Sequence, residues 1–156
     1  NPYGNGQIIG VLLLVGVGKI LTTSFTISSG GSGGVFWPSM VIGGALGGVM
    51  GLIFKDIWPQ TVDRIDVFVI LGMASFFAAA ARTPVSTLIM VSELTSSYAL
   101  LLPSMWVCAL AYLVSWSWTI YREQVQTRID SPAHRGDFLI DVLEGMSVDD
   151  VLTPAD

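Results

Sequence analysis

A glycine-rich loop in front of a helix start is the part of this sequence with the clearest chemical potential. The loop, Ser28-Ser29-Gly30-Gly31-Ser32-Gly33-Gly34, leads into Val35-Phe36-Trp37-Pro38. Its glycines forbid a continuous helix, whereas Pro38 suits the first turn of a new one because no N–H is needed there. The first backbone N–H groups of a helix lack carbonyl partners and carry partial positive charge. The loop therefore predicts either an anion site or a simple connector.

Phosphate binding is a form of anion chemistry that this loop does not support. A P-loop needs Gly-Lys-Ser/Thr after its glycines, and no lysine lies between Lys19 and Lys55. A dinucleotide site needs a preceding strand in a soluble sheet, which is missing as well. Both phosphate uses are therefore set aside.

The anion hypothesis rests on backbone groups rather than on side chains. Gly33 permits unusual φ angles, so the amides of Gly34, Val35 and Phe36 can converge on one point. Dehydrating an ion in a low-dielectric medium costs roughly tens of kcal/mol, and charge-assisted hydrogen bonds of about 1.5–3 kcal/mol each offset part of that cost. A neutral amide nest also binds weakly enough to release the ion, as conduction requires. The residues that shape the loop and the helix start are Gly31, Ser32, Gly33 and Pro38.

The composition of the chain is that of a membrane protein with a polar tail. Of its 156 residues 12% are charged and 52% hydrophobic, whereas a soluble domain carries about a quarter charged residues. This excludes a disordered chain, a nucleic-acid binder and most soluble enzymes. Residues 122–156 hold three basic and eight acidic residues and supply the whole net charge of −5. An apolar, neutral body is therefore followed by a short acidic tail.

The sequence offers no ligand set for a metal ion. Cys108 is the only cysteine and lies in an apolar run, where a buried small hydrophobe is expected. His134 is the only histidine and lies in the polar tail. A single cysteine also excludes an internal disulfide. We therefore predict neither a metal site nor a cofactor.

The first two apolar segments are long enough to cross a bilayer. Residues 8–27 reach the ~30 Å of a hydrocarbon core at about 1.5 Å per residue. Residues 37–54 follow, and Gly43, Gly47 and Gly51 form a small-xxx-small seam along them. Such a seam lets another helix approach closely. We therefore expect a second helix against these glycines.

Polar side chains occupy the second half of the first segment. They are Lys19, Thr22, Thr23, Ser24 and Thr26. Lipid does not tolerate that density of polar groups, so this face should point at protein or water. Lys19 would snorkel or find a partner, or alternatively attract an anion.

The remaining apolar segments are either too short to span a bilayer or are followed by charged residues. Residues 67–81 and 85–94 are too short to span a bilayer upright, so we expect a broken or re-entrant helix pair there. Residues 99–120 are predicted to form one full-length span. Three arginines follow this span closely, which places its end in the cytoplasm by the positive-inside bias.

Three further side chains admit a functional and a structural interpretation. Glu93 would relay protons within the membrane, or it would bond at a helix end to nearby hydroxyls or amides, with Thr95, Ser96, Ser97 and Tyr98 as available partners. Arg82 is better explained as an interfacial anchor than as a ligand. Tyr121, taken alone, would be an interfacial aromatic.

In their order along the chain these motifs resemble the CLC family of chloride channels and chloride/proton antiporters. Residues 33–38 look like its Gly-x-Phe-x-Pro motif, and residues 43–48 are similar to the helix that follows. Residues 82–95 resemble its arginine-x-proline helix with a Glu-Leu/Met-Thr element. Residues 120–122 resemble the short last membrane helix that carries a pore tyrosine, and residues 145–151 look like the entry to the cytoplasmic CBS pair.

The resemblance implies an all-α, polytopic membrane fold of tilted and broken helices, built from two inverted halves with a pore in each subunit of a homodimer. Residues 1–121 would be its last six membrane helices, residues 122–137 a cytoplasmic linker, and residues 138–156 the truncated start of a CBS-like domain. The protein would lie in the plasma (inner) membrane with its C-terminus in the cytoplasm. Its partners would be chloride and the bilayer, with no nucleic acid.

The resemblance also implies transmembrane chloride transport, by a channel or a proton-coupled antiporter. The amides of Val35 and Phe36 would bind the central anion, and the hydroxyl of Tyr121 would donate from the other side. Residues 85–94 and 100–120 would contribute to the dimer interface. The family's Gly-Ser-Gly-x-Pro loop and its two functional glutamates do not occur here and are expected upstream of residue 1. Nucleotide binding would belong to the missing CBS region.

Two functions of other classes stay open at this point. A non-transporting membrane scaffold would need only the glycine seam. An intramembrane enzyme would use a serine with Glu93, but no His, Asp or Lys lies where it would activate that serine as its base.

Overall fold

The described part of the chain is helical. A computed structural model describes residues 4–96, 98–116, 118–121, 125 and 130–131, and no strand occurs among them. Its elements are α1 (Asn5–Ser28), α2 (Phe36–Ile57), α3 (Ile65–Ala81), α4 (Pro84–Thr95), the 3-10 turn η1 (Tyr98–Leu100) and α5 (Leu101–Val114). The chain divides into two compact units, residues 1–120 and 121–156. The predicted all-α class is confirmed.

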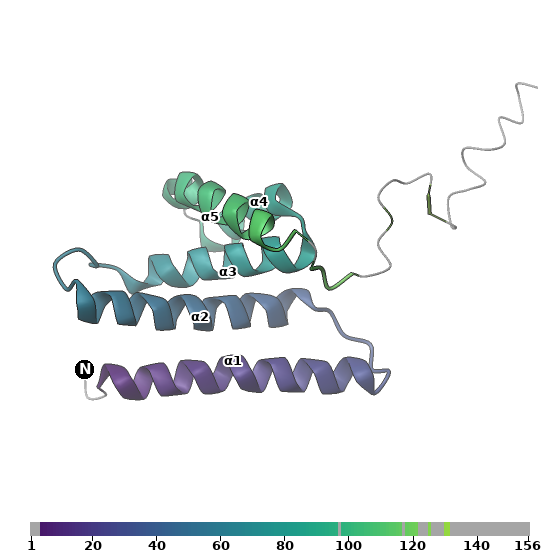
Figure 1. Cartoon of the computed structure of the whole chain (residues 1–156), viewed down its shortest axis with the longest axis horizontal. Coiled ribbons are helices and arrows are strands. Elements are labelled where there is room, and N and C mark those ends of the chain that lie inside the picture. Colours follow the sequence, from purple (N-terminus) through teal and green to yellow (C-terminus); the bar gives the residue numbers. More distant parts are fainter. Residues whose placement is uncertain (1–3, 97, 117, 122–124, 126–129, 132–156) are drawn as a thin grey trace, which may run out of the picture. The chain divides into compact units, whose positions relative to one another are not determined.

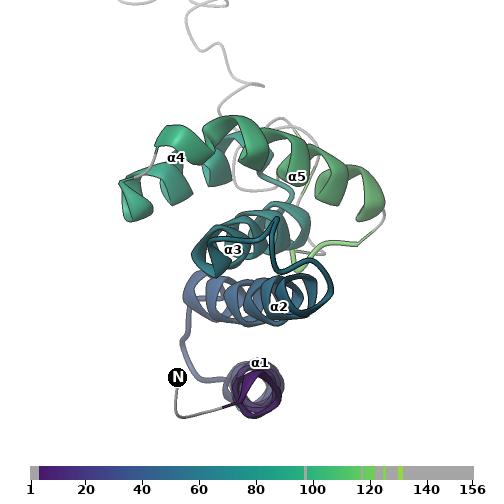
Figure 2. The ribbon, with the colours of Figure 1, turned by 90° about the vertical axis from the view of Figure 1, so that its left-hand side faces the viewer.

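Within the first unit, α2 and α3 form the centre. α2 lies between α1 and α3, and α4 and α5 cover the other side of α3 (Figures 1 and 2). The chain reverses direction between α1 and α2 and again between α2 and α3 (Figure 1). α1 is the outer helix, with Gly16 as its buried residue, whereas eleven residues of α2 are buried.

The first four predicted helices are confirmed, with boundaries that differ by at most three residues. Among the described elements, α1 and α2 are long and apolar enough to cross a membrane, and α3 and the stretch Tyr98–Val114 are shorter apolar helices. The predicted break between α3 and α4 is also present. Arg82 ends α3 with a left-handed φ of 57°, and Pro84 begins α4.

The prediction of one full-length span over residues 99–120 is wrong. A 3-10 turn precedes α5, and α5 ends at Val114. Beyond α5 the N–H of Ile120 donates to the carbonyl of Ala80, near the end of α3, at 3.0 Å. Of residues 120–122, which resemble part of a short last membrane helix, the described residues 120 and 121 are not helical. Residues 122–124 and the CBS-like segment 138–156 lie outside the described residues.

The predicted glycine seam is confirmed as a backbone-to-backbone contact between α2 and α3. A Cβ placed on Gly43 would lie 2.5 Å from the carbonyl oxygen of Gly72. A Cβ on Gly47 would overlap the carbonyl oxygen of Phe68, and one on Gly72 would overlap the backbone of α2. A methyl group at these positions would therefore force the helices apart.

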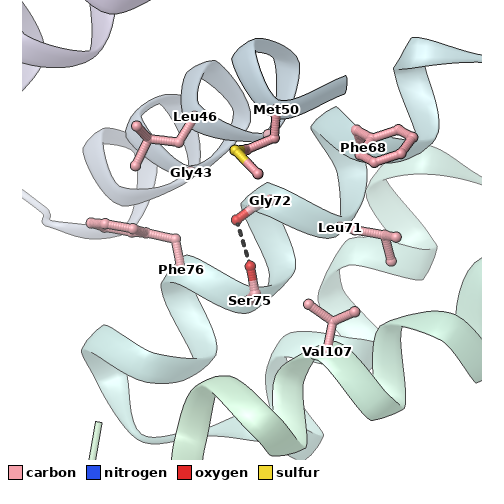
Figure 3. A pocket seen from close by; sticks show the side chains of 10 residues that line it. Gly43, Leu46, Met50, Phe68, Leu71, Gly72, Ser75, Phe76 and Val107 are labelled. Atoms are coloured by element: carbon pink, nitrogen blue, oxygen red, sulfur yellow. Dashed lines mark hydrogen bonds between the residues drawn. The ribbon is translucent and has the colours of Figure 1, made fainter. Parts of the chain in front are cut away.

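An apolar hollow of about 360 Å³ lies beside this seam. Side chains of α2 and α3, together with Val107 of α5, line it (Figure 3). The Ser75 hydroxyl at its edge donates to the carbonyl of Gly72 at 3.2 Å. The hollow holds no charged side chain, so it has little to offer an anion.

The buried core joins the start of α2 to α3, α4 and α5. Its members are Met40, Ala74, Phe77, Ala78, Ala81, Val91 and Cys108. Phe36, the first residue of α2, packs edge-on against Phe77 with ring centroids 4.9 Å apart. This contact fixes the start of α2 to the centre of the fold, because edge-to-face aromatic pairs add to the stabilisation from burial.

The seam predicts that Gly47→Ala destabilises the full-length protein by about 1–3 kcal/mol, the usual cost of overpacking. Gly44→Ala on the same helix is the matched control, because its Cβ would meet side-chain atoms, the nearest being Met73 Cγ at 3.2 Å. Thermal melting of the detergent-solubilised protein measures both variants. Equal melting temperatures for the two would contradict the seam.

Candidate anion site at the start of α2

The first glycines of the loop close the end of α1. Gly30 adopts φ +78°, and its N–H donates to the carbonyl of Ile27 at 3.1 Å. The N–H of Gly31 donates to the carbonyl of Thr26, also at 3.1 Å. These two bonds form a Schellman motif, which satisfies carbonyls that a helix end otherwise leaves unpaired. The connector interpretation therefore holds for Gly30 and Gly31.

The opposite end of the loop leaves backbone donors open. Val35 caps α2, and its carbonyl accepts from both the N–H and the hydroxyl of Ser39, at 3.1 and 2.7 Å. Pro38 lies in the first turn and has no N–H to satisfy. Among the described residues, nothing accepts a hydrogen bond from the amides of residues 34–37. The amides that the sequence singled out are therefore available to a ligand.

A polar hollow of about 220 Å³ lies between α1 and this loop. Its lining residues are Lys19, Thr22, Thr23, Thr26, Ile27, Gly33, Gly34 and Pro38. The polar face of α1, predicted to point at protein or water, thus contributes four polar residues to this hollow. No carboxylate is among these lining residues, so half-buried Lys19 and the start of α2 both favour negative charge there.

The sequence did not predict that the α1 face and the loop meet. One signal in the sequence could have indicated this contact. The spacing of Lys19, Thr22, Thr23 and Thr26 places them on one side of a helix. The hydroxyl of Thr22 donates to the carbonyl of Lys19 at 3.1 Å, and that of Thr26 to the carbonyl of Thr22 at 2.8 Å. Their protons thus bond within α1, and Lys19 supplies the positive charge of the hollow.

Of the other predicted site residues, Tyr121 belongs to the second unit, and its role as an anion ligand stays a prediction. Glu93 accepts a hydrogen bond from the hydroxyl of Tyr98 at 2.9 Å, and both side chains are exposed. This matches the structural interpretation of Glu93. Arg82 lies over the ring of Tyr112, 5.3 Å from its centroid. Its guanidinium is therefore engaged within the fold, whereas an interfacial role stays a prediction.

Comparisons with known proteins agree in pointing to one family. The family described as "Voltage gated chloride channel" matches residues 3–116. The chain is 36% identical over 107 residues to the H(+)/Cl(-) exchange transporter ClcA of Yersinia pestis bv. Antiqua (strain Angola), which covers 69% of this chain and 22% of that protein. It is 40% identical over 98 residues to the ClcA of Vibrio cholerae serotype O1, covering 63% of the chain and 21% of that relative. The chain thus spans about a fifth of the length of the relatives it matches.

The Schellman motif predicts that Gly30→Ala destabilises the full-length protein by about 1–2 kcal/mol, the cost of a left-handed φ for an L-residue with a Cβ. Gly30→Asn should lose less, since asparagine tolerates this conformation better. Melting temperatures of the two variants test this order. A Gly30→Ala protein as stable as the wild type would show that the left-handed turn is not required.

Proposed function

Because this chain belongs to the voltage-gated chloride channel family, we propose that it forms part of a transmembrane chloride transporter that holds its anion on the backbone amides of Gly34, Val35 and Phe36. The observation that carries this proposal is the set of open amides at the start of α2. Gly34 adds no side chain that would cover them. The packing of Phe36 on Phe77 keeps this helix start in place.

Amides suit transport because they supply charge stabilisation without a full charge at the binding point. Each charge-assisted hydrogen bond contributes about 1.5–3 kcal/mol, which offsets part of the cost of dehydrating chloride. Release stays possible because no cationic side chain lies among the proposed ligands. Lys19 lines the neighbouring hollow and would raise the local anion concentration from there.

Within this proposal, Tyr121 donates its hydroxyl to the same anion as a second ligand. A tyrosine hydroxyl is a neutral donor, so it adds to the amide nest without trapping the ion. We favour proton-coupled exchange over passive conduction, because the relatives described above are named exchange transporters. Glu93 has a structural role in this scheme, since Tyr98 engages its carboxylate.

The proposed assembly is a homodimer in the inner membrane with a cytoplasmic C-terminus. The outer faces of α4 and α5 expose large apolar side chains, which suits an interface or lipid. They are Val85, Ile89, Leu102, Met105, Trp106 and Leu110. The CBS-like segment 138–156 would belong to a regulatory domain.

Transport is the function that best unites these features. CLC proteins are transporters rather than enzymes, which removes the alternative of a serine enzyme that uses Glu93. A scaffold would need the α2–α3 seam but would not need open amides beside a cationic hollow. Chloride flux through the reconstituted full-length protein separates transport from scaffolding.

The amide nest predicts that Val35→Pro weakens chloride binding about ten- to hundredfold, because proline deletes one charge-assisted donor. Val35→Ala keeps the amide and should bind chloride as the wild type does. Isothermal calorimetry on the full-length protein measures both affinities, with melting temperatures as the check on folding. Unchanged binding by a folded Val35→Pro protein would reject the nest.

Bromide offers a direct view of the same site. Crystals of the complete dimer grown in bromide should show anomalous density within hydrogen-bond distance of the amides of Val35 and Phe36. Val35→Pro crystals should lose part of that density. Bromide along an unrelated path, with none at the start of α2, would overturn the proposal.

A further inference from the structure

The C-terminal end of α3 is in contact with the segment that follows α5. The carbonyl of Ala80 accepts from the N–H of Ile120 at 3.0 Å and from the hydroxyl of Thr119 at 3.4 Å. One residue earlier, the carbonyl of Ala79 accepts from the hydroxyl of Ser115 at 3.3 Å. The segment after α5 therefore lies beside the last turn of α3.

A cation, Arg82, lies at the same end of α3. Arg82 directly follows the helix, and its guanidinium lies over the ring of Tyr112 of α5, 5.3 Å from the centroid. Such stacking uses the face of a guanidinium and leaves the N–H groups at its edge able to donate. Arg82 is half-buried, and the ion pair found among the described residues is a different one, Arg64 with Asp66. Within the described part of the chain, the charge of Arg82 therefore has no carboxylate partner.

The acidic residues described in the first unit lie away from this cation. Asp56, Asp63 and Asp66 belong to the end of α2, the loop after it and the start of α3, at the opposite end of α3 from Arg82 (Figure 1). Glu93 lies near the far end of α4 and accepts a hydrogen bond from a tyrosine hydroxyl there. The end of α3 thus carries a positive charge that no described acidic residue balances.

Two exposed tryptophans belong to the segment that contacts α3. Trp116 and Trp118 are 65% and 78% exposed, and Ile120, 44% exposed, adds apolar surface next to them. A tryptophan combines a large apolar ring with one N–H donor, and such residues are enriched at the headgroup level of membranes. The combination of an unpaired cation with exposed indoles therefore fits the boundary between lipid headgroups and acyl chains.

We propose that this surface binds the headgroup of an anionic phospholipid. The surface, here called the lipid site, comprises Arg82, Trp116 and Trp118. The edge of the guanidinium donates to phosphate oxygens, a geometry that matches two oxygens at once, while the indoles lie at the level where the acyl chains begin. A net negative headgroup is favoured over a zwitterionic one, because the lipid site offers a cation and no acidic side chain. This inference goes beyond chloride transport and does not depend on the anion site at the start of α2.

The test uses native mass spectrometry of the full-length protein in detergent, with phosphatidylglycerol and phosphatidylcholine as probes. The wild type should bind phosphatidylglycerol more tightly than phosphatidylcholine. Arg82→Gln should weaken phosphatidylglycerol binding about fivefold, the value of one basic residue at an anionic lipid surface, and phosphatidylcholine binding by less. Lys55→Gln removes a cation at the other end of the fold, near the end of α2, and as the matched control should bind both lipids as the wild type does.

Several results would overturn the inference. Equal affinity of the wild type for the two lipids would do so, as would an equal loss in Arg82→Gln and Lys55→Gln. Unchanged phosphatidylglycerol binding by Arg82→Gln would mean that another partner, such as a carboxylate elsewhere in the full-length protein, neutralises the arginine. Soluble glycerol phosphate should not compete, because it lacks acyl chains, and effective competition would instead indicate a site for free phosphate.

A second measurement uses the wild type and so does not depend on the folding of Arg82→Gln. Phosphatidylglycerol with a photoreactive group at the start of its acyl chain should label the peptide that contains Trp116 and Trp118. The corresponding phosphatidylcholine should label it less. Labelling by phosphatidylglycerol that is confined to other parts of the protein would contradict the lipid site.

Discussion

Backbone groups left unpaired at helix ends are the constraint on which this structure depends. A helix leaves N–H groups open at its start and carbonyls open at its end, and apolar surroundings make each open group costly. α1 closes its end within its own loop, through Gly30 and Gly31. α3 closes its end with a distant segment, through Ala80 and Ile120. The start of α2 has no such partner among the described residues, and we assign that role to an anion.

Close packing of α2 on α3 gives this open helix start a rigid support. Gly47 and Gly72 bring the two backbones into direct contact, so α2 has little freedom to slide or rotate. Phe36 then packs on Phe77 within one turn of the open amides. Rigid support matters because amides stabilise an ion well only when they are preorganised around it. The glycine seam therefore supports the helix start that carries the candidate anion site.

Sequence reasoning succeeded where a residue type has one physical consequence. The glycines at positions 43 and 47 predicted a close helix contact, and Pro38 predicted a helix start. It failed for residues 115, 116 and 118–120, because the apolar pattern of the stretch 99–120 did not indicate that Ile120 bonds to Ala80 of a distant helix. The polar face of α1 was recognised, but its contact with the loop was not. Local patterns do not state which distant segment a polar face will meet.

By itself, the sequence determined the helical class, the first four helices, the break after α3 and the residues of the candidate nest. Each of these follows from local chemistry: hydrophobic length, the fixed φ of proline and the missing side chain of glycine. Only the tertiary structure decided that Lys19 lines the same hollow as Gly33 and Gly34, and that α5 ends at Val114 while Ile120 bonds to Ala80. Those outcomes depend on which unpaired groups come together in the folded chain. The free energy of such a contact depends on helices that are far apart in the sequence.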